Sequence, residues 1–308
     1  MLATESFFKG GEAPMYFSKN RNNSFNLDLT MRYIFLSLFL ALSSVVWAAD
    51  YQCVKTDNGV KLVNGSTVVW ELVVKTLEGK PYIHPVALPD GRVISELRPR
   101  DHRWHTGLWF SWKFINGVNY WEPSNGKTEV VSWDAVIDGL SATVTIKLRY
   151  FDDRNPDVIL LTEDRTIVFS APDEKGSYSI SFKHHFTAGN ADLVFDRTPL
   201  NIPWGGYAGL SLRMNQSVKG FKLTCENGGN TKHAVRAKPA SWLDFRDEKT
   251  GMGVRFTILK GTEPSRFYMQ NNGHYYIIPS PVHEGQITCK AGESFDLEYL
   301  LEIGKISN

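Results

Sequence analysis

The chain has 308 residues, of which 13% are aromatic, and a formal net charge of +1. Lysine and arginine are scattered among acidic residues, so the sequence lacks the basic stripe that binding to nucleic-acid phosphates or to a membrane surface requires. Three cysteines allow at most one internal disulfide, which excludes a fold stapled by several bridges.

An apolar run at residues 33–46 follows Met31 and Arg32 and precedes Ala48 and Ala49. This pattern is typical of a secretory signal peptide, because the run is too short to span a bilayer comfortably and ends in small residues at a cleavage site. We predict a signal peptide at residues 31–48, a retained membrane anchor being the alternative. Residues 1–30 are interpreted as a mis-assigned start or a disordered extension, and the rest of the chain as periplasmic or secreted.

From residue 50 onwards the dominant pattern is alternation of apolar and polar residues, without helical periodicity. Residues 142–150 show this alternation most clearly, which predicts a strand with one buried and one solvent-exposed face. Glycine, proline and asparagine turns separate many such segments. We predict strands at residues 60–63, 67–74, 82–88, 107–112, 130–137, 142–150, 158–169, 178–186, 193–196, 209–214, 221–225, 242–245, 252–259, 267–270, 275–278, 286–290 and 295–303, and no helix. The predicted fold class is all-β, a large antiparallel β-sandwich that forms one domain over residues 50–308.

Residues 98–121 hold the densest cluster of aromatic and titratable side chains, and we expect them to begin as a loop and become a strand at Gly107. Histidine changes charge near neutral pH, and aromatic rings stack on sugar rings, so this composition is typical of a site that binds a sugar and moves a proton. His102 and His105 would point to opposite faces of a straight strand, so a shared role requires a bend. They are predicted to be an acid/base pair or metal ligands, with solvated loop histidines as the plain alternative.

A divalent metal is the weaker of these two functional hypotheses. The sequence contains no HExxH and no CxxC motif, and a zinc site needs three or four ligands. His84, His185, His274 or His283 could complete such a site across the sheet. We therefore predict no cofactor, with a divalent metal as the alternative.

The segment at residues 198–213 is the second unusual stretch. Its glycines would let the backbone approach a ligand near Tyr207, and Arg213 could bind oxygen atoms through both arms of its guanidinium group. A sheet corner with bulges is the alternative. Trp121 and Glu122 form a similar pair, because an aromatic ring beside a carboxylate can stack on a sugar and accept its hydroxyl groups.

The third stretch lies at residues 271–285 and contains His274, His283 and Glu284. A neighbouring acid raises a histidine's affinity for its proton, provided the two side chains touch. His283 and Glu284 are therefore predicted to be a catalytic pair, the alternative being ordinary turn and edge residues.

Together these stretches resemble a bacterial family of unknown function that often carries the label methane oxygenase PmoA. The resemblance covers nearly all of the chain after the predicted signal peptide and rests on Lys80-Pro81-Tyr82, His84-Pro85, Asp101-His102, residues 105–110, Asn116-Gly117-Val118, Trp121, residues 205–213 and residues 281–285. The activity in that label is not expected here, because a membrane monooxygenase subunit needs several long apolar spans. The resemblance instead implies a supersandwich fold similar to that of galactose-mutarotase-like proteins, and carbohydrate chemistry.

The first motif of that family usually reads Asp-His-Pro-His-His-Arg-Gly. Here Arg103 and Trp104 replace the proline and one histidine, and Thr106 replaces the arginine. This departure weakens a metal site built from three histidines.

We therefore expect an exported protein whose partner is a small carbohydrate or glycoside, with no nucleic-acid partner and no membrane association once the signal peptide is removed. The leading hypothesis is an enzyme that transfers a proton on that sugar, as an epimerase, lyase or hydrolase does; a noncatalytic carbohydrate-binding module is the alternative. The candidate catalytic residues are His102, His105, Glu122, His283 and Glu284. The candidate substrate-binding residues are His84, Arg98, Asp101, Trp121, Tyr207, Arg213 and His274.

Overall fold

The structure is a computed structural model that describes residues 50–270 and 275–306. The chain divides into two units, Met1–Ala48 and Ala49–Asn308, and all described residues belong to the second. The predicted signal peptide at residues 31–48 and the segment before it lie outside the described residues, as does the candidate residue His274.

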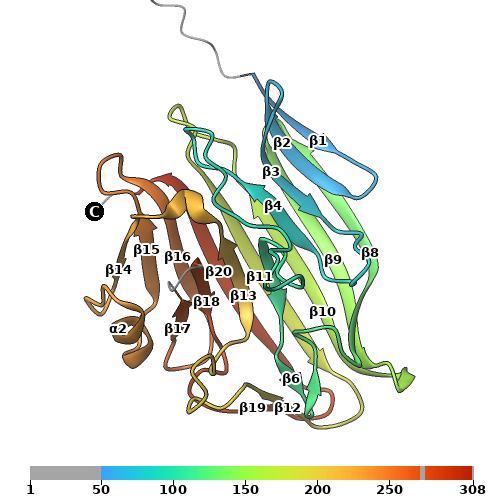
Figure 1. The fold of residues 1–308 in the computed structure, drawn as a ribbon. Coiled ribbons are helices and arrows are strands. Elements are labelled where there is room, and N and C mark those ends of the chain that lie inside the picture. The colour runs from blue at the N-terminus through green and yellow to red at the C-terminus, as the bar shows by residue number, and fades with distance from the viewer. Residues whose placement is uncertain (1–49, 271–274, 307–308) are drawn as a thin grey trace, which may run out of the picture. The chain divides into compact units, whose positions relative to one another are not determined.

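The first of two large sheets has eight strands in the order β1-β2-β3-β4-β5-β13-β18-β17, with antiparallel neighbours throughout (Figure 1). Its strands are Tyr51–Lys55 (β1), Gly59–Asn64 (β2), Thr67–Val73 (β3), Tyr82–Val86 (β4), Leu108–Ser111 (β5), Gly209–Met214 (β13), Tyr275–Pro279 (β18) and Phe267–Gln270 (β17).

The second large sheet also has eight antiparallel strands, in the order β14-β15-β16-β20-β11-β10-β9-β8. Its strands are Lys222–Cys225 (β14), Trp242–Arg246 (β15), Met252–Lys260 (β16), Ser294–Lys305 (β20), Tyr178–Ala188 (β11), Asn155–Phe169 (β10), Ser141–Asp152 (β9) and Gly126–Asp138 (β8). A small third sheet consists of Ile287–Cys289 (β19), Leu193–Asp196 (β12), Phe114–Ile115 (β6) and Val118–Asn119 (β7).

The main hydrophobic core lies between the two large sheets. In β9 and β11 every second side chain is buried, because successive residues of a strand point to opposite faces. Rings from the two sheets meet there: Trp70 of β3 stacks on Phe169 of β10 with centroids 3.9 Å apart, and Phe110 of β5 contacts His184 of β11 at 4.4 Å. The two layers therefore form a β-sandwich.

Strands β5 and β13 are buried on both faces. Phe110, Leu210 and Leu212 belong to the main core, whereas Trp109 belongs to a second, aromatic cluster on the outer face of the same sheet. A sheet whose outer face met only solvent would show polar residues there, so this double burial indicates that loops cover the outer face. The candidate site lies under those loops.

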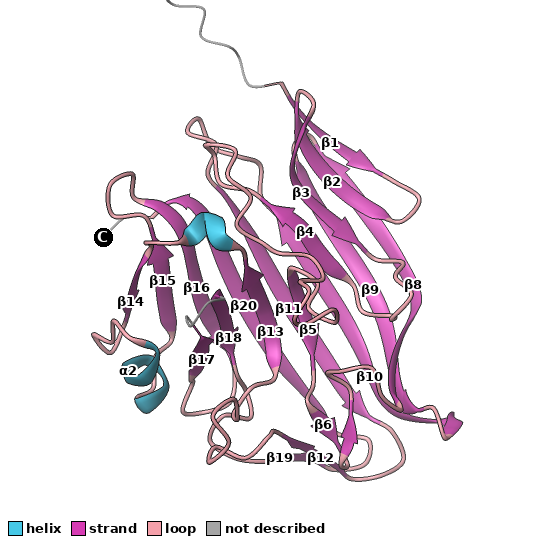
Figure 2. Ribbon diagram, viewed as in Figure 1, coloured by secondary structure: helices cyan, strands magenta, loops and turns pink. Residues whose placement is uncertain are grey.

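The predicted all-β fold is confirmed, and Figure 2 shows how little of the chain is helical. The prediction of no helix was wrong at Lys232–Ala237 (α2), a single turn and a half that Thr231 caps through its side chain, and at the 3-10 turn Gln216–Val218. Six residues are too few for a helical period to stand out in a sequence. Strands β1, β6 and β7 were not predicted.

All three cysteines, Cys53, Cys225 and Cys289, are free thiols. Within residues 50–270 and 275–306, no helix is both long and apolar enough to cross a lipid bilayer.

Candidate functional site

A cavity of about 340 Å³, here called the histidine cavity, lies on the outer face of the first sheet. Its aromatic walls are Trp104, Trp121, Trp204, Tyr207, Tyr268 and Tyr276. Its polar lining residues are His102, His105, Glu122 and Gln270. Segments far apart in the sequence therefore converge on one point, as predicted for residues 98–121 and 198–213.

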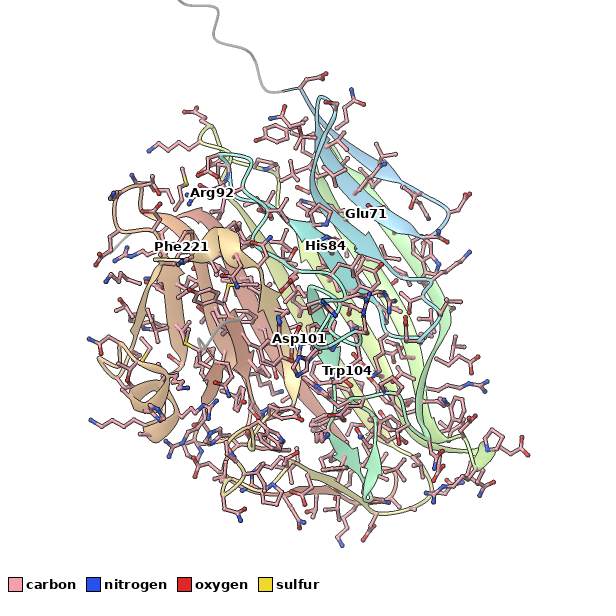
Figure 3. All side chains as sticks on the ribbon, in the orientation of Figure 1. Glu71, His84, Arg92, Asp101, Trp104 and Phe221 are labelled. Carbon is pink, nitrogen blue, oxygen red and sulfur yellow. The ribbon has the colours of Figure 1, made fainter. Side chains whose placement is uncertain are left out.

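The loop before β5 bends so that both imidazoles reach this cavity. Arg98 has a φ of +51° and Gly107 a φ of +82°, and between them the backbone of His105 accepts a hydrogen bond from the Arg98 N–H at 2.7 Å. The rings of His102 and His105 stack with centroids 4.6 Å apart and planes 25° apart. The bend that a shared role requires is present, and Figure 3 shows Asp101 and Trp104 of this loop near each other on the outer face of the sheet.

Arg213 of β13 ties this loop to the sheet. Its guanidinium group is buried and donates hydrogen bonds to both carboxylate oxygens of Asp101 at 3.1 Å and to Glu96 at 3.2 Å. The other side of Asp101 faces His102, whose Nδ1 lies 2.7 Å from Oδ2. Burial alone would raise the pKa of Asp101, but these hydrogen bonds and the positive charge of Arg213 lower it to about 2.

The two imidazoles have partners of opposite hydrogen-bonding character. A carboxylate only accepts, so His102 donates through Nδ1 to Asp101 and keeps a lone pair on Nε2 when neutral. A guanidinium group only donates, so Nδ1 of His105, 3.5 Å from Nη1 of Arg213, accepts, which leaves the proton of the neutral ring on Nε2. In these tautomers Nε2 of His102 is an acceptor, whereas Nε2 of His105 is a hydrogen-bond donor.

Glu122 lines the cavity from the loop between β7 and β8. Its Oε2 accepts hydrogen bonds from Lys113 at 2.5 Å and Asn119 at 2.7 Å, while Oε1 lies 3.4 Å from the hydroxyl of Tyr207. Burial alone would raise the pKa of Glu122, but the hydrogen bond and charge of Lys113 lower it. The group is therefore a carboxylate at neutral pH, able to accept hydrogen bonds from a ligand.

The aromatic rings pack closely around the histidines. Tyr276 stacks on His105 with centroids 4.8 Å apart, and Trp121 contacts Tyr207 at 4.9 Å. Burial raises the pKa of both tyrosines, so their hydroxyl groups remain protonated. Trp121 and Tyr207, which were predicted to bind a substrate, both line the cavity.

Five lining residues were not among the predicted site residues, namely Trp104, Trp204, Tyr268, Gln270 and Tyr276. Tyr268, Gln270 and Tyr276 stand on alternate positions of β17 and β18, whose other side chains enter the main core. When both faces of a strand are buried, the residue pattern in the sequence does not show which face contains a site. Trp104 could have been predicted from the sequence, because it lies between His102 and His105 along the chain.

Six of the described candidates do not line the cavity. Two of them, Asp101 and Arg213, contact its histidines. His84 lies farther along the sheet (Figure 3), where Nδ1 is 2.9 Å from the hydroxyl of Ser95. Arg98 forms a two-pronged ion pair with Glu78 at 2.6 and 2.8 Å. The remaining pair, His283 and Glu284, belongs to the turn after β18. The structure does not bring His84, Arg98, His283 and Glu284 into the lining of the cavity.

His283 and Glu284 are only weakly paired with each other. The imidazole Nδ1 lies 3.9 Å from Oε1 of Glu284, and that carboxylate instead pairs with Arg266. Burial outweighs the acid and lowers the pKa of His283 to about 4. Glu284 does raise the pKa of His283, as expected for a neighbouring acid, but the desolvation of the imidazole has the larger effect.

In the described part of the chain, no group of three or more histidine, cysteine, aspartate or glutamate side chains is arranged to hold a metal ion. The histidines considered as additional ligands are dispersed. His84 contacts Ser95 on the first sheet, His185 contacts Asp296 on the second, and His283 lies in the turn after β18.

Solved structures with low sequence identity are similar to this chain. The α-galactosidase from Lactobacillus brevis is 9% identical with a TM-score of 0.42, and the match covers 83% of this chain and 39% of that one. A galactose mutarotase related enzyme from Lactobacillus acidophilus is 6% identical with a TM-score of 0.40, over 82% and 97% of the two chains. The galactosidase domain of an α-galactosidase-sucrose kinase is 10% identical with a TM-score of 0.37, over 83% and 40%.

The chain thus spans about two fifths of the length of the two galactosidase structures. A comparison with curated protein sequences found no match. The model of a family of unknown function, DUF6807, matches residues 59–305, and its description carries no methane oxygenase label. Because this match covers most of the sequence, the chain belongs to the DUF6807 family.

Proposed function

We propose that this protein binds a carbohydrate in the histidine cavity and transfers a proton on it, as in epimerisation, elimination or hydrolysis. The observation that supports the proposal best is the pairing of His102 and His105. Two stacked imidazoles with opposite hydrogen-bonding partners, one a carboxylate and one a guanidinium group, face the same aromatic-walled cavity.

In the proposed reaction His102 is the general base: it takes a proton from the sugar at Nε2, and Asp101 stabilises the resulting imidazolium. Arg213 holds neutral His105 in the tautomer whose Nε2 donates a hydrogen bond to the sugar oxygen on which negative charge develops. His102 then returns its proton to the product, to the leaving group or to water, which restores both rings. Glu122 accepts hydrogen bonds from sugar hydroxyl groups and orients the ring.

The size and walls of the cavity suit one sugar unit. Its volume of about 340 Å³ lies near the lower end of the range for small-molecule sites, which is about 300–1,000 Å³. Trp121 and Tyr207 supply aromatic rings for stacking, while Gln270 and Glu122 supply polar groups that line the same cavity.

The test is turnover of ordinary and oxidised glycosides in D₂O, followed by mass spectrometry for deuterium uptake, loss of water or cleavage. We expect His102→Gln and His105→Ala each to slow the reaction about 100-fold or more, the usual loss when one general base or one hydrogen-bond donor to the transition state is removed. His185→Gln is the matched control, because that histidine also contacts an aspartate but lies on the second sheet.

Wild-type rates in both His102→Gln and His105→Ala would refute the assigned roles. If the wild-type protein binds sugars but changes none of them, the noncatalytic binding module replaces the enzyme. The same proposal includes action in the periplasm or outside the cell, which rests on the signal-peptide pattern at residues 31–48.

A further inference from the structure

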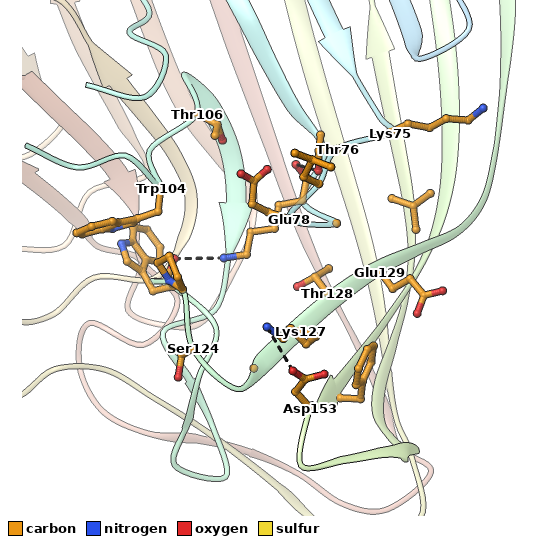
Figure 4. A pocket seen from close by; sticks show the side chains of 18 of the residues that line it. Lys75, Thr76, Glu78, Trp104, Thr106, Ser124, Lys127, Thr128, Glu129 and Asp153 are labelled. Carbon is orange, nitrogen blue, oxygen red and sulfur yellow. Dashed lines mark hydrogen bonds and ion pairs between the residues drawn. The ribbon is translucent and has the colours of Figure 1, made fainter. Parts of the chain in front are cut away.

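A second, larger cavity of about 730 Å³ adjoins the histidine cavity. Trp104, Trp121 and Glu122 line both, so they form the boundary between the two. The larger cavity extends from this boundary along β8 towards Asp153, as Figure 4 shows. A ligand held in the histidine cavity can therefore continue past the two indole rings into a second binding space.

The acidic groups of the larger cavity are already paired with cations. Each of its four carboxylates lies within ion-pair distance of a basic side chain: Glu78 with Arg98, Glu122 with Lys113, Glu129 with Arg149, and Asp153 with Lys127. The cavity therefore presents little unpaired negative charge to a ligand.

Lys80 differs from these carboxylates, because its side-chain partners are uncharged. Its ammonium group is held by two backbone carbonyls, those of Tyr120 and Trp121, and no carboxylate of the described residues lies within ion-pair distance of it. These bonds use two of its three donors. A second lysine, Lys75, lies at the rim of the same cavity (Figure 4).

The surroundings of Lys80 make its charge costly. Burial lowers the pKa of Lys80 to about 8, although Glu122 and Glu78 act in the opposite direction. An anionic group bound beside this ammonium would supply a direct countercharge and raise the pKa of Lys80 again.

We propose that the larger cavity binds an acidic sugar unit, bearing a carboxylate or a sulfate, that is linked to the unit held in the histidine cavity. The natural ligand is then an acidic oligosaccharide or glycoside of at least two units. Lys80 binds its anionic group, and Trp104 and Trp121 flank the linkage. This inference rests on the function proposed above and names its substrate class.

The test compares the binding of maltose, cellobiose and lactose with that of their C6 carboxylate and 6-O-sulfate derivatives, by calorimetry. We expect at least one acidic derivative to bind at least tenfold more tightly than its neutral parent. In Lys80→Gln, which keeps hydrogen-bond donors but removes the charge, the acidic and neutral compounds should bind equally. The carboxylate and sulfate arms identify which anion the cavity prefers.

Two further variants keep the test decisive. Lys147→Gln is the charge control, because that lysine is exposed on β9 outside both cavities, and it should keep the full preference. Ser132→Trp, at an exposed position lining the larger cavity, should weaken disaccharide binding while leaving the matching methyl monosaccharide unaffected.

The inference is wrong if no acidic derivative binds more tightly than its parent, or if Lys80→Gln retains the preference. It is also wrong if Ser132→Trp weakens the monosaccharide and the disaccharide alike. These outcomes differ from failure of the catalytic proposal, in which wild-type protein binds the acidic ligands through Lys80 but transfers no proton on them.

Discussion

Arg213 determines how the two histidines differ. It contacts Asp101, which orients His102, and it also contacts His105 directly. One buried guanidinium group therefore determines the hydrogen bonding of both imidazole rings. The sequence alone showed both histidines, Asp101 and Arg213 as candidates. It could not show that Arg213, more than 100 positions downstream, lies between them, because that contact depends on β13 pairing with β5.

At the same scale, His283 is predicted to make the protein sensitive to acid. Its pKa of about 4 in the folded chain lies below the usual value of 6.5. Between these two pH values the unfolded state therefore binds a proton at this histidine and the folded state does not. Stability should therefore fall as the pH drops from 6.5 to 4, by on the order of 3 kcal/mol from this group.

Thermal or urea unfolding of wild type and His283→Gln across pH 4–8 measures this contribution. The variant should lose less stability on acidification than the wild type. Since burial also lowers the pKa of His84 and His184, the comparison must use the difference between the two proteins. Parallel curves for wild type and variant would contradict the prediction.

At the scale of elements, the strands of the first sheet set the floor of the site. The positions of most strands could be predicted because alternation and turn residues are local signals, and β12, β13 and β17 have the predicted bounds. Which face of β5 meets the core and which meets a ligand could not be predicted, because both Trp109 and Phe110 are large, apolar and buried. Only the packing of the second sheet against one face decides it.

Gly107 joins the histidine loop to β5, and we predict that it tolerates no side chain. Its φ is +82°, and an added Cβ would lie 2.6 Å from the carbonyl oxygen of Ile83 and 3.1 Å from Cβ of His84. Gly107→Ala should therefore cost about 1–3 kcal/mol and weaken sugar binding, since the backbone at the loop must shift.

Gly139→Ala serves as the comparison, because Gly139 has a similar positive φ of +57° at the tip of the β8–β9 hairpin but open space around it. It should cost about 1 kcal/mol and leave sugar binding unchanged. Equal losses of stability and affinity in the two variants, measured by urea unfolding and calorimetry, would mean that the close contact at Gly107 does not matter.

At the scale of the whole described unit, a buried ionic network stabilises the sandwich behind the site. Glu163 accepts hydrogen bonds from Arg165 at 2.6 Å, from His184 at 2.7 Å and from Tyr150, and all four are almost fully buried. Burial alone would raise the pKa of Glu163, but the charge of Arg165 lowers it to about 2. The network faces Phe110 of the opposite sheet, so it lies directly beneath the strand that bears the site.

We predict that Glu163→Gln destabilises the protein by about 3–5 kcal/mol, because it leaves the guanidinium group of Arg165 buried without a countercharge. Asp164→Asn is the neighbouring control: Asp164 points to the other face, where its ion pair with Lys147 is exposed and worth at most about 1 kcal/mol. Urea unfolding of both variants measures the difference. Similar losses in the two would show that the buried network contributes no more than a surface pair.

The histidine cavity has a floor made of strands and a rim made of loops. Tyr268, Gln270 and Tyr276 stand on β17 and β18, whereas Trp204 projects from the loop before β13 and is 58% exposed. Floor residues share their strands with the main core, so changing them risks the fold, while the rim can vary without that cost. Retuning ligand preference in the laboratory should therefore begin with libraries randomised at residues 199–204, leaving the strand scaffold as found.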